Sequence, residues 1–128
     1  MPDHVHLLVR SRKKDSKIER LLFGIKRLFS FRVKRNLVDH ASPLLKQLMQ
    51  QGRLGKSVFR FWQAGPGYDR NLNSSSGVVE AIEYIHFNPV KQKLCDSPDK
   101  WKWSSWSSYN GSDQQDDPDL PRVERFGR

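Results

Sequence analysis

The sequence predicts a small α+β domain with an antiparallel sheet and helices packed on it. Residues 4–10 alternate in the manner of a strand, and residues 58–63 form a second strand-like run that ends at Gly65-Pro66-Gly67. Three other stretches show helical signals. The chain has 128 residues, of which 36% are hydrophobic, so its length is that of one domain. We expect this domain over residues 1–110, followed by a polar, flexible tail over residues 111–128.

The predicted N-terminal strand carries two histidines on one face. Side chains alternate along a strand, so His4 and His6 point to the same side. Two imidazoles at this spacing are close enough to share one cation. The spacing alone is nevertheless more typical of structural histidines than of a metal site, and both interpretations stay open on this observation.

The first predicted helix is strongly basic. It extends from Asp15 to about Arg35, and Asp15 or Ser16 can cap its start. Between Arg12 and Arg35 there are ten basic residues and two acidic ones, a surplus of eight within a formal net charge of +9. Such a run is either a solvated surface or a contact for a polyanion. Nucleic acid is the first candidate for that polyanion and an acidic membrane surface the second.

Two further helices are predicted downstream. Ser42-Pro43 begins a short leucine-rich helix that Gly52 ends. Residues 73–76 offer several caps for another helix, which ends near Pro89. Tyr84 and Asn88 lie four residues apart on this second helix, so they share one of its faces.

Composition limits the class of protein. No apolar run approaches the roughly 20 residues that span a bilayer, and the N-terminus lacks the apolar core of a secretion signal, so we expect a cytoplasmic protein without a membrane partner. Cys95 is the single cysteine, which excludes a disulfide framework or a thiolate zinc finger. Residues 101–109 contain three tryptophans and a tyrosine, and we expect them to dock on the domain.

The candidate chemical groups combine into one reaction. Cleavage of a phosphodiester by tyrosine needs a nucleophilic phenol, a Lewis acid on the phosphate and nearby positive charge. An Asn88 oxygen can complete a metal site with His4 and His6 while the Tyr84 phenol approaches the same phosphate. A mixed nitrogen and oxygen set suits Mg or Mn. Taken singly, Tyr84 is more typical of a core residue and Asn88 of a helix end.

Four motifs in order also carry a family resemblance. Residues 1–9, Met-Pro-Asp-His-Val-His-Leu-Leu-Val, resemble the metal-binding strand of HUH single-strand endonucleases and, more narrowly, of REP-associated tyrosine transposases. The other motifs are Phe61-Trp62-Gln63 with Tyr68-Asp69-Arg70-Asn71, the run Tyr84-Ile85-His86-Phe87-Asn88-Pro89-Val90, and Trp101-Lys102-Trp103-Ser104-Ser105. The similarity covers residues 1 to about 110, and the motif that begins at Tyr84 is its most specific part.

The resemblance implies a fold, a reaction and a cofactor. The fold is the HUH endonuclease-like variant of the ferredoxin-like arrangement. Tyr84 is the nucleophile that attacks a phosphate of single-stranded or hairpin DNA, leaving a 5′-phosphotyrosine and a free 3′-hydroxyl, and rejoining is the reverse reaction. His4, His6 and Asn88 hold a divalent metal, Mg or Mn, which polarises the phosphate.

The remaining assignments concern DNA contact. With the resemblance, the basic helix is expected to bind phosphates through Lys26, Arg27, Arg32 and Lys34. Arg70 either touches DNA or orders the loop of its motif. Trp62 can stack on bases, although packing in the core is the favoured interpretation. His86 lies two residues from Tyr84 on a helix and therefore faces away from it, which argues against a third histidine ligand.

One departure from the family concerns the N-terminus. Related chains carry several dozen residues before the His-x-His strand, whereas this chain begins three residues before His4. The resemblance therefore implies a fold that is incomplete at this end, with the strand at an edge that favours dimerisation, so a monomer and a homodimer both stay open. The alternative function is a catalytically weak DNA-binding remnant or regulator. A membrane-surface protein explains neither the histidine pair nor the Tyr84 motif.

Overall fold

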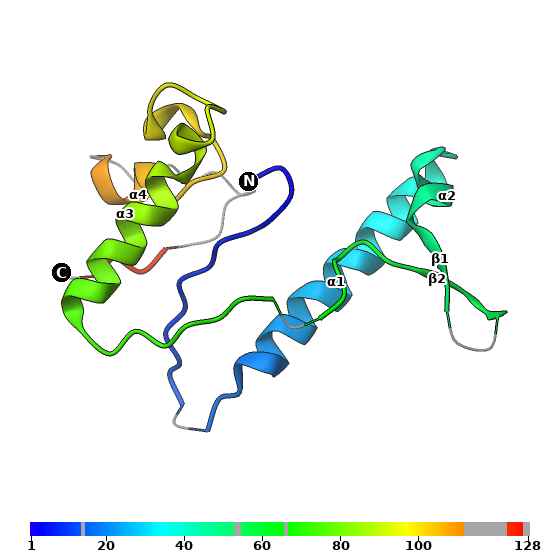
Figure 1. Cartoon of the computed structure of the whole chain (residues 1–128), viewed down its shortest axis with the longest axis horizontal. Helices are drawn as coiled ribbons and strands as arrows, with labels where there is room; N and C mark the ends of the chain where they lie inside the picture. The colour runs from blue at the N-terminus through cyan, green and yellow to red at the C-terminus, as the bar shows by residue number, and fades with distance from the viewer. Residues whose placement is uncertain (14, 53–54, 66, 112–122, 127–128) are drawn as a thin grey trace. The chain divides into compact units, whose positions relative to one another are not determined.

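The computed structural model describes residues 1–13, 15–52, 55–65, 67–111 and 123–126. Within them the protein is a small α+β fold of helices and a two-stranded antiparallel sheet (Figure 1). Packing divides the chain into two compact units, one formed by residues 1–10 and 70–128 and the other by residues 11–69. Most of the predicted tail lies outside the described residues. No helix in the described part is long and apolar enough to cross a membrane.

Helix α1 (Ile18–Asp39) dominates the unit of residues 11–69 and confirms the predicted basic helix. It starts later than predicted, and Lys17 precedes it without a side-chain cap, so the assignment of Asp15 or Ser16 as cap was wrong. The reason is a local turn, in which the N–H of Ser16 donates to the carbonyl of Lys13. At the other end the helix continues past Arg35 to Asp39.

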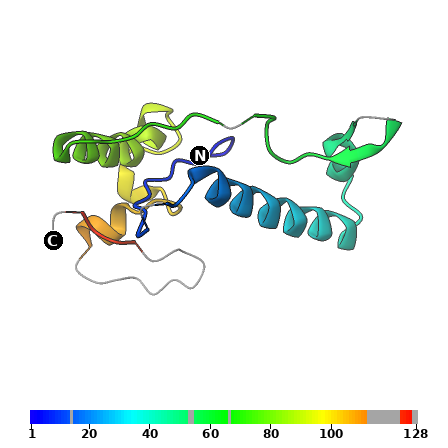
Figure 2. The ribbon, with the colours of Figure 1, turned by 90° about the horizontal axis from the view of Figure 1, so that it is seen from below.

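The predicted helix over residues 42–52 is shorter in the structure. Helix α2 (Leu44–Leu48) ends where strand β1 (Met49–Gln51) begins, and β1 pairs antiparallel with β2 (Ser57–Phe59). Met49 lies opposite Phe59 in this register. Residues 49–51 form backbone hydrogen bonds with β2 and do not continue the helix, because a helix of five residues is only marginally stable by itself. Figures 1 and 2 show α2 and this hairpin at the C-terminal end of α1.

The second predicted strand, over residues 58–63, is confirmed only as far as Phe59, because the next aromatic residues turn onto α1. The rings of Phe61 and Trp62 lie 5.1 and 5.5 Å from the ring of Phe29. The indole N–H of Trp62 donates to the carbonyl of Lys26 at 3.1 Å. Trp62 is half-buried, in agreement with the packing interpretation.

The other unit is built on helix α3 (Ser75–Lys91), which confirms the predicted helix and one of its predicted caps. The hydroxyl of Ser74 accepts a hydrogen bond from the N–H of Gly77 at 3.1 Å. The helix passes through Pro89 and ends two residues later at Lys91. Two short helices follow, the 3-10 helix η2 (Pro98–Lys100) and α4 (Trp106–Asn110).

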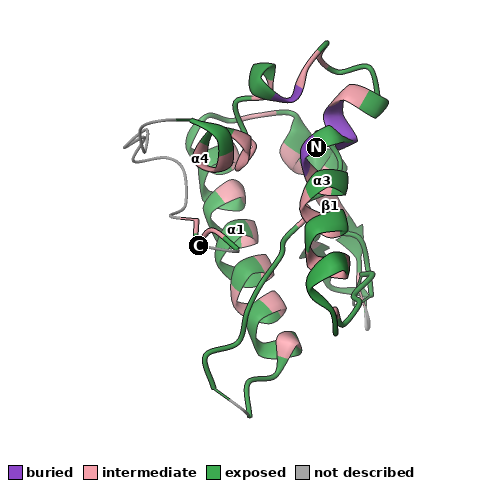
Figure 3. Ribbon diagram, turned by 90° about the vertical axis from the view of Figure 1, so that its left-hand side faces the viewer, coloured by how far each residue is buried: buried purple, intermediate pink, exposed green. Residues whose placement is uncertain are grey.

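The aromatic segment docks as expected, through two of its residues. The rings of Trp106 and Tyr109 each lie 5.4 Å from the ring of His86 on α3, whereas Trp103 stays 62% exposed. The buried positions of the described residues gather here, at the end of α3 and in η2 (Figure 3). They are His86, Asn88, Pro89 and Pro98.

The prediction of a strand at residues 4–10 was wrong. The segment runs without helix or strand, and no ladder partner for it occurs among the described residues. A strand is defined by backbone pairing with a neighbour, which an alternating sequence cannot supply. Val5, Leu7 and Val9, the apolar face of the predicted strand, are all exposed.

Candidate functional site

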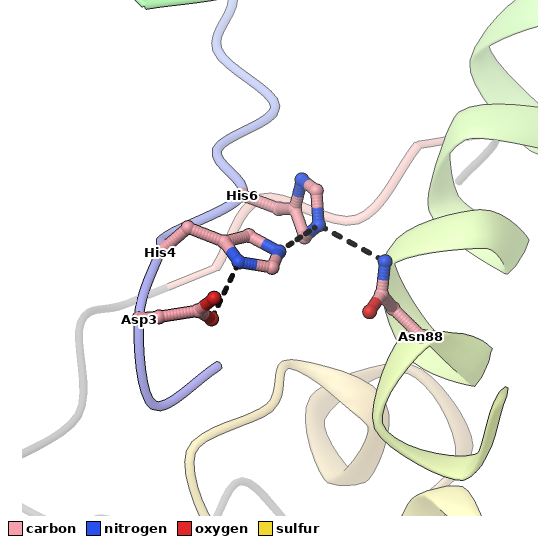
Figure 4. Close-up of polar contacts among 4 residues, drawn as sticks. All are labelled: Asp3, His4, His6 and Asn88. Atoms are coloured by element: carbon pink, nitrogen blue, oxygen red, sulfur yellow. Dashed lines mark hydrogen bonds and ion pairs between the residues drawn. The ribbon is translucent and has the colours of Figure 1, made fainter. Parts of the chain in front are cut away.

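Although the N-terminal segment is not a strand, it places His6 against α3 and His4 against His6. Nε2 of His4 lies 3.0 Å from Nε2 of His6, and Nε2 of His6 lies 3.1 Å from Nδ2 of Asn88 (Figure 4). The structure thus brings together three residues that the sequence analysis assigned to one metal. It joins positions that are 82 residues apart in the chain.

Asp3 extends this line of contacts. Its carboxylate lies 2.7 Å from Nδ1 of His4, so the N–H at that position donates to it (Figure 4). This hydrogen bond is the main cause that lowers the pKa of Asp3 below its ordinary value. A carboxylate that holds one imidazole nitrogen fixes the ring and directs the lone pair of the other nitrogen outward, as in many metal sites. Sequence reasoning missed Asp3, although its position beside His4 is a usable signal.

The contact between the two histidines depends on where their protons lie. When Asp3 accepts from Nδ1 of His4 and the Asn88 amide donates to Nε2 of His6, two nitrogen lone pairs face each other at 3.0 Å. With the amide in this orientation, neutral rings leave that contact without a bridging proton. Added positive charge, either a proton on one ring or a metal ion between them, resolves it. Burial, followed by the charges of His4 and the N-terminus, lowers the pKa of His6 and favours its neutral ring.

The carboxamide of Asn88 contains an unsatisfied atom. The residue is only 5% exposed, and its Oδ1 is buried with no hydrogen-bond partner among the described residues. Such an atom is costly unless something binds it. A half-turn about the Cβ–Cγ bond exchanges the two amide atoms and directs the oxygen toward His6. The oxygen that a hard divalent cation needs is therefore available at this position.

Two contact distances in this cluster, both of hydrogen-bond length, are also compatible with adjacent ligands of an octahedral cation. Two adjacent ligands at about 2.1 Å from a metal and at right angles to each other are separated by about 3.0 Å. The separations of 3.0 and 3.1 Å around Nε2 of His6 agree with that value. In the described part of the chain, no group of three or more His, Cys, Asp or Glu side chains is arranged so that it could hold a metal ion. A cation bound here would therefore depend on His4, His6 and the Asn88 amide.

Tyr84 lies beside this cluster. The edge of its ring meets the ring of His6, with 5.4 Å between the ring centroids, and its side chain is 49% exposed. Asn88 follows one turn later on α3. The ammonium of Lys91 lies 5.4 Å from the centroid of the Tyr84 ring. The phenol is thus accessible and has the histidine cluster and a cation as neighbours.

His86 belongs to the packing of α3 and not to this cluster. It is 3% exposed, and its Nε2 lies 2.8 Å from the Ser105 hydroxyl. Burial lowers its pKa below the ordinary value, which favours the neutral ring. The prediction that His86 faces away from Tyr84 agrees with these contacts, but its partner Ser105 was not anticipated.

The structure distributes the predicted DNA-binding residues of α1 over different faces. The ammonium of Lys26 donates to the carbonyl of Gly65 at 3.0 Å, so it serves the unit's own packing. Arg27 and Lys34 are exposed and seven residues apart, which places them on one stripe of the helix. Arg32 is also exposed but points about 140° away from Arg27.

Arg70 is exposed and lies in the same unit as Tyr84. One of its guanidinium nitrogens approaches the first turn of α3, about 4.0 Å from the position that a Cβ at Gly77 would occupy. Gly77 precedes Tyr84 by seven residues, a rise of about 10 Å along the helix. Arg70 therefore lies at the start of α3. It is outside the cluster of His4, His6 and Asn88, which is near the C-terminal half of that helix.

Comparisons with protein-family models, with curated proteins and with solved structures each find no match. The geometry of the site and the motifs of the sequence are therefore the basis for assigning a function.

Proposed function

We propose that this chain is a metal-dependent transposase or endonuclease that cuts and rejoins single-stranded or hairpin DNA through Tyr84. We also propose that the chain has an HUH endonuclease-like fold. The main support for the proposed function is the convergence of His4, His6 and the Asn88 amide, at distances compatible with an octahedral cation, beside the accessible phenol of Tyr84. A separate metal site and a separate tyrosine would have no common reaction, whereas together they match the needs of phosphodiester cleavage.

The reaction is a transesterification. The Tyr84 hydroxyl loses its proton to solvent, and its oxygen forms a bond to phosphorus while the bond from phosphorus to the 3′-oxygen breaks. That oxygen takes a proton from solvent and leaves as a 3′-hydroxyl, and the 5′-phosphate stays on the tyrosine. A bound Mg or Mn ion would withdraw charge from the phosphate oxygens. Rejoining reverses each bond change, because the phosphotyrosine keeps the energy of a diester.

The chain's own residues hold the components of this reaction. Asp3 orients the His4 ring through the hydrogen bond at Nδ1. Because Tyr84 and Asn88 are on one helix, the distance between nucleophile and ligand is set by a single rigid element. The exposed cations of α1, Arg27 and Lys34 first among them, would supply phosphate contacts that carry little base specificity.

A labelled hairpin DNA with a single-stranded flank tests this proposal. The protein is incubated with the DNA and Mg or Mn, and the products are separated on a denaturing gel. We expect a covalent adduct with the wild-type chain and none with Tyr84→Phe, while the DNA affinity of the variant is unchanged. Tyr68→Phe is the matched control, because Tyr68 is 91% exposed and lies in the other unit, and it should keep the adduct.

Two results would count against the proposal. An adduct that persists in Tyr84→Phe removes Tyr84 as the nucleophile. A wild-type chain that binds the DNA but forms no adduct at any metal concentration favours the alternative, a DNA-binding remnant or regulator.

A further inference from the structure

The charged side chain of Lys91 contacts the ring of Tyr84. Its ammonium lies 5.4 Å from the ring centroid. Tyr84, Asn88 and Lys91 occupy positions i, i+4 and i+7 of α3, so all three lie on one stripe of the helix. Neither the sequence motifs nor the metal site assigned any role to this lysine.

The surroundings of Lys91 leave its charge available. None of the ion pairs found among the described residues involves it, and its side chain is exposed. Contact with a ring face uses the charge of an ammonium but none of its three N–H groups. Those donors stay free for the oxygens of an anion that approaches the phenol.

We propose that Lys91 binds the phosphate that Tyr84 attacks and stabilises the negative charge that develops on the phenol oxygen. This inference rests on the proposed function. The Tyr84 ring has His6 as one neighbour and Lys91 as another, so the incoming phosphate would meet the histidine cluster and the ammonium together. A cation beside the ring of the nucleophile can act on charge that appears only during the reaction. Lys91 would also serve the reverse step, because the same phosphate is then bonded to Tyr84.

A structural role makes different predictions. A lysine in the last turn stabilises the helix because its positive charge lies near the negative end of the helix dipole, and any nearby cation does the same. Lys93 is the matched control, because it lies two residues further on and is also exposed. Its backbone is left-handed, with φ of 57°, so Lys93→Asn removes the charge with a residue that tolerates this conformation.

The test measures the single-turnover rate of adduct formation on the labelled hairpin DNA with saturating Mn²⁺. We expect Lys91→Met to lower this rate by roughly 100-fold, the lower end of the range seen when one charge-stabilising donor is removed. Lys91→Arg should keep most of the rate, and Lys93→Asn should equal wild type. The rise of the rate with pH should move to higher pH in Lys91→Met and stay in place in Lys91→Arg. Melting temperatures report whether each variant is folded, and Lys91→Gln replaces Lys91→Met if the latter unfolds.

The outcomes separate the two proposals. A wild-type adduct together with an unchanged rate in Lys91→Met overturns the inference and leaves the proposed function intact. An equal loss in Lys91→Met and Lys91→Arg, with no shift of the pH profile, assigns Lys91 to structure and also overturns the inference. If wild type forms no adduct, the proposed function fails and the inference fails with it.

Discussion

Nδ2 of Asn88 lies 3.1 Å from Nε2 of His6, and the other amide atom, Oδ1, is buried without a hydrogen-bond partner among the described residues. This contact ties α3 to the N-terminal segment at the position where a third metal ligand is expected. It also places the unsatisfied oxygen on the residue that would supply that ligand. Both observations make Asn88 the most informative position for testing the metal site.

Replacement of Asn88 should change the affinity for Mn²⁺ according to the oxygen that the new residue offers. Asn88→Leu keeps the branching of the side chain but removes both amide atoms, and we expect it to weaken Mn²⁺ binding by about 10-fold or more. Asn88→Asp supplies a charged oxygen and should bind at least as tightly as wild type. Isothermal titration calorimetry measures both affinities. Equal affinity in wild type and Asn88→Leu would show that Asn88 is not a ligand.

The two histidines should account for the response to divalent cations. Replacement of both His4 and His6 by alanine removes the only pair of imidazoles at the site, so adduct formation should lose its dependence on Mg or Mn. His40→Ala is the control, because His40 is exposed and belongs to the unit of residues 11–69. The measurement is the yield of adduct against cation concentration. An unchanged cation response in the double variant would remove the site from these residues.

Asp3 should act on the metal through His4. Its carboxylate accepts from Nδ1 of His4, so Asp3→Asn keeps the shape but loses the charge that holds the ring. Loss of such a partner typically lowers metal affinity by about 10- to 100-fold. We expect a decrease in that range in a Mn²⁺ titration, with the fold unchanged by circular dichroism because Asp3 is exposed. The same affinity in both proteins would show that the His4 ring is held by other contacts.

These elements show what the sequence could and could not predict. Helices α1 and α3 were predicted because apolar spacing and the Ser74 cap are local signals. Strand β1 was missed, and residues 4–10 were wrongly assigned as a strand, because a strand depends on a partner far away in the sequence.

In the candidate site, too, the contacts between residues close in sequence could be predicted and the contacts between distant residues could not. His4 with His6, and Tyr84 with Asn88, are pairs whose proximity follows from a spacing of two or four residues. Their meeting across 82 positions, and the contact of His86 with Ser105, depend on tertiary packing. Lys91 was overlooked because it lies just after the motif that runs from Tyr84 to Val90. Its spacing of seven residues from Tyr84 was nevertheless visible in the sequence.

The buried ring of His86 should make the unit of residues 1–10 and 70–128 sensitive to acid. Burial lowers its pKa in the folded chain below the unfolded value of about 6.5, so the unfolded chain binds the proton more readily. The stability from the neutral ring is complete above about pH 6.5 and is lost as the pH falls toward the folded pKa.

The melting temperature in the presence of a metal chelator, between pH 7 and pH 5, measures this effect. His86→Gln should reduce the fall in melting temperature, because glutamine fills part of the site and has no proton to gain. The fall should not vanish, since the pKa of His6 is lowered with the same sign. His40→Gln is the control and should follow wild type. A pH response identical in wild type and His86→Gln would rule out His86 as its source.

The exposed cations of α1 should determine the salt dependence of DNA binding, whereas Lys26 should not. Arg27 and Lys34 share one stripe of the helix, but the ammonium of Lys26 is held by the carbonyl of Gly65. Each phosphate contact on single-stranded DNA contributes about 0.7 to the slope of log affinity against log salt concentration. Replacement of both Arg27 and Lys34 by alanine should therefore reduce the slope by about 1.4. Fluorescence anisotropy of labelled single-stranded DNA at several salt concentrations measures it, with Lys26→Met as the comparison. If Lys26→Met lowers the slope and the double variant does not, the phosphates contact a different face of α1.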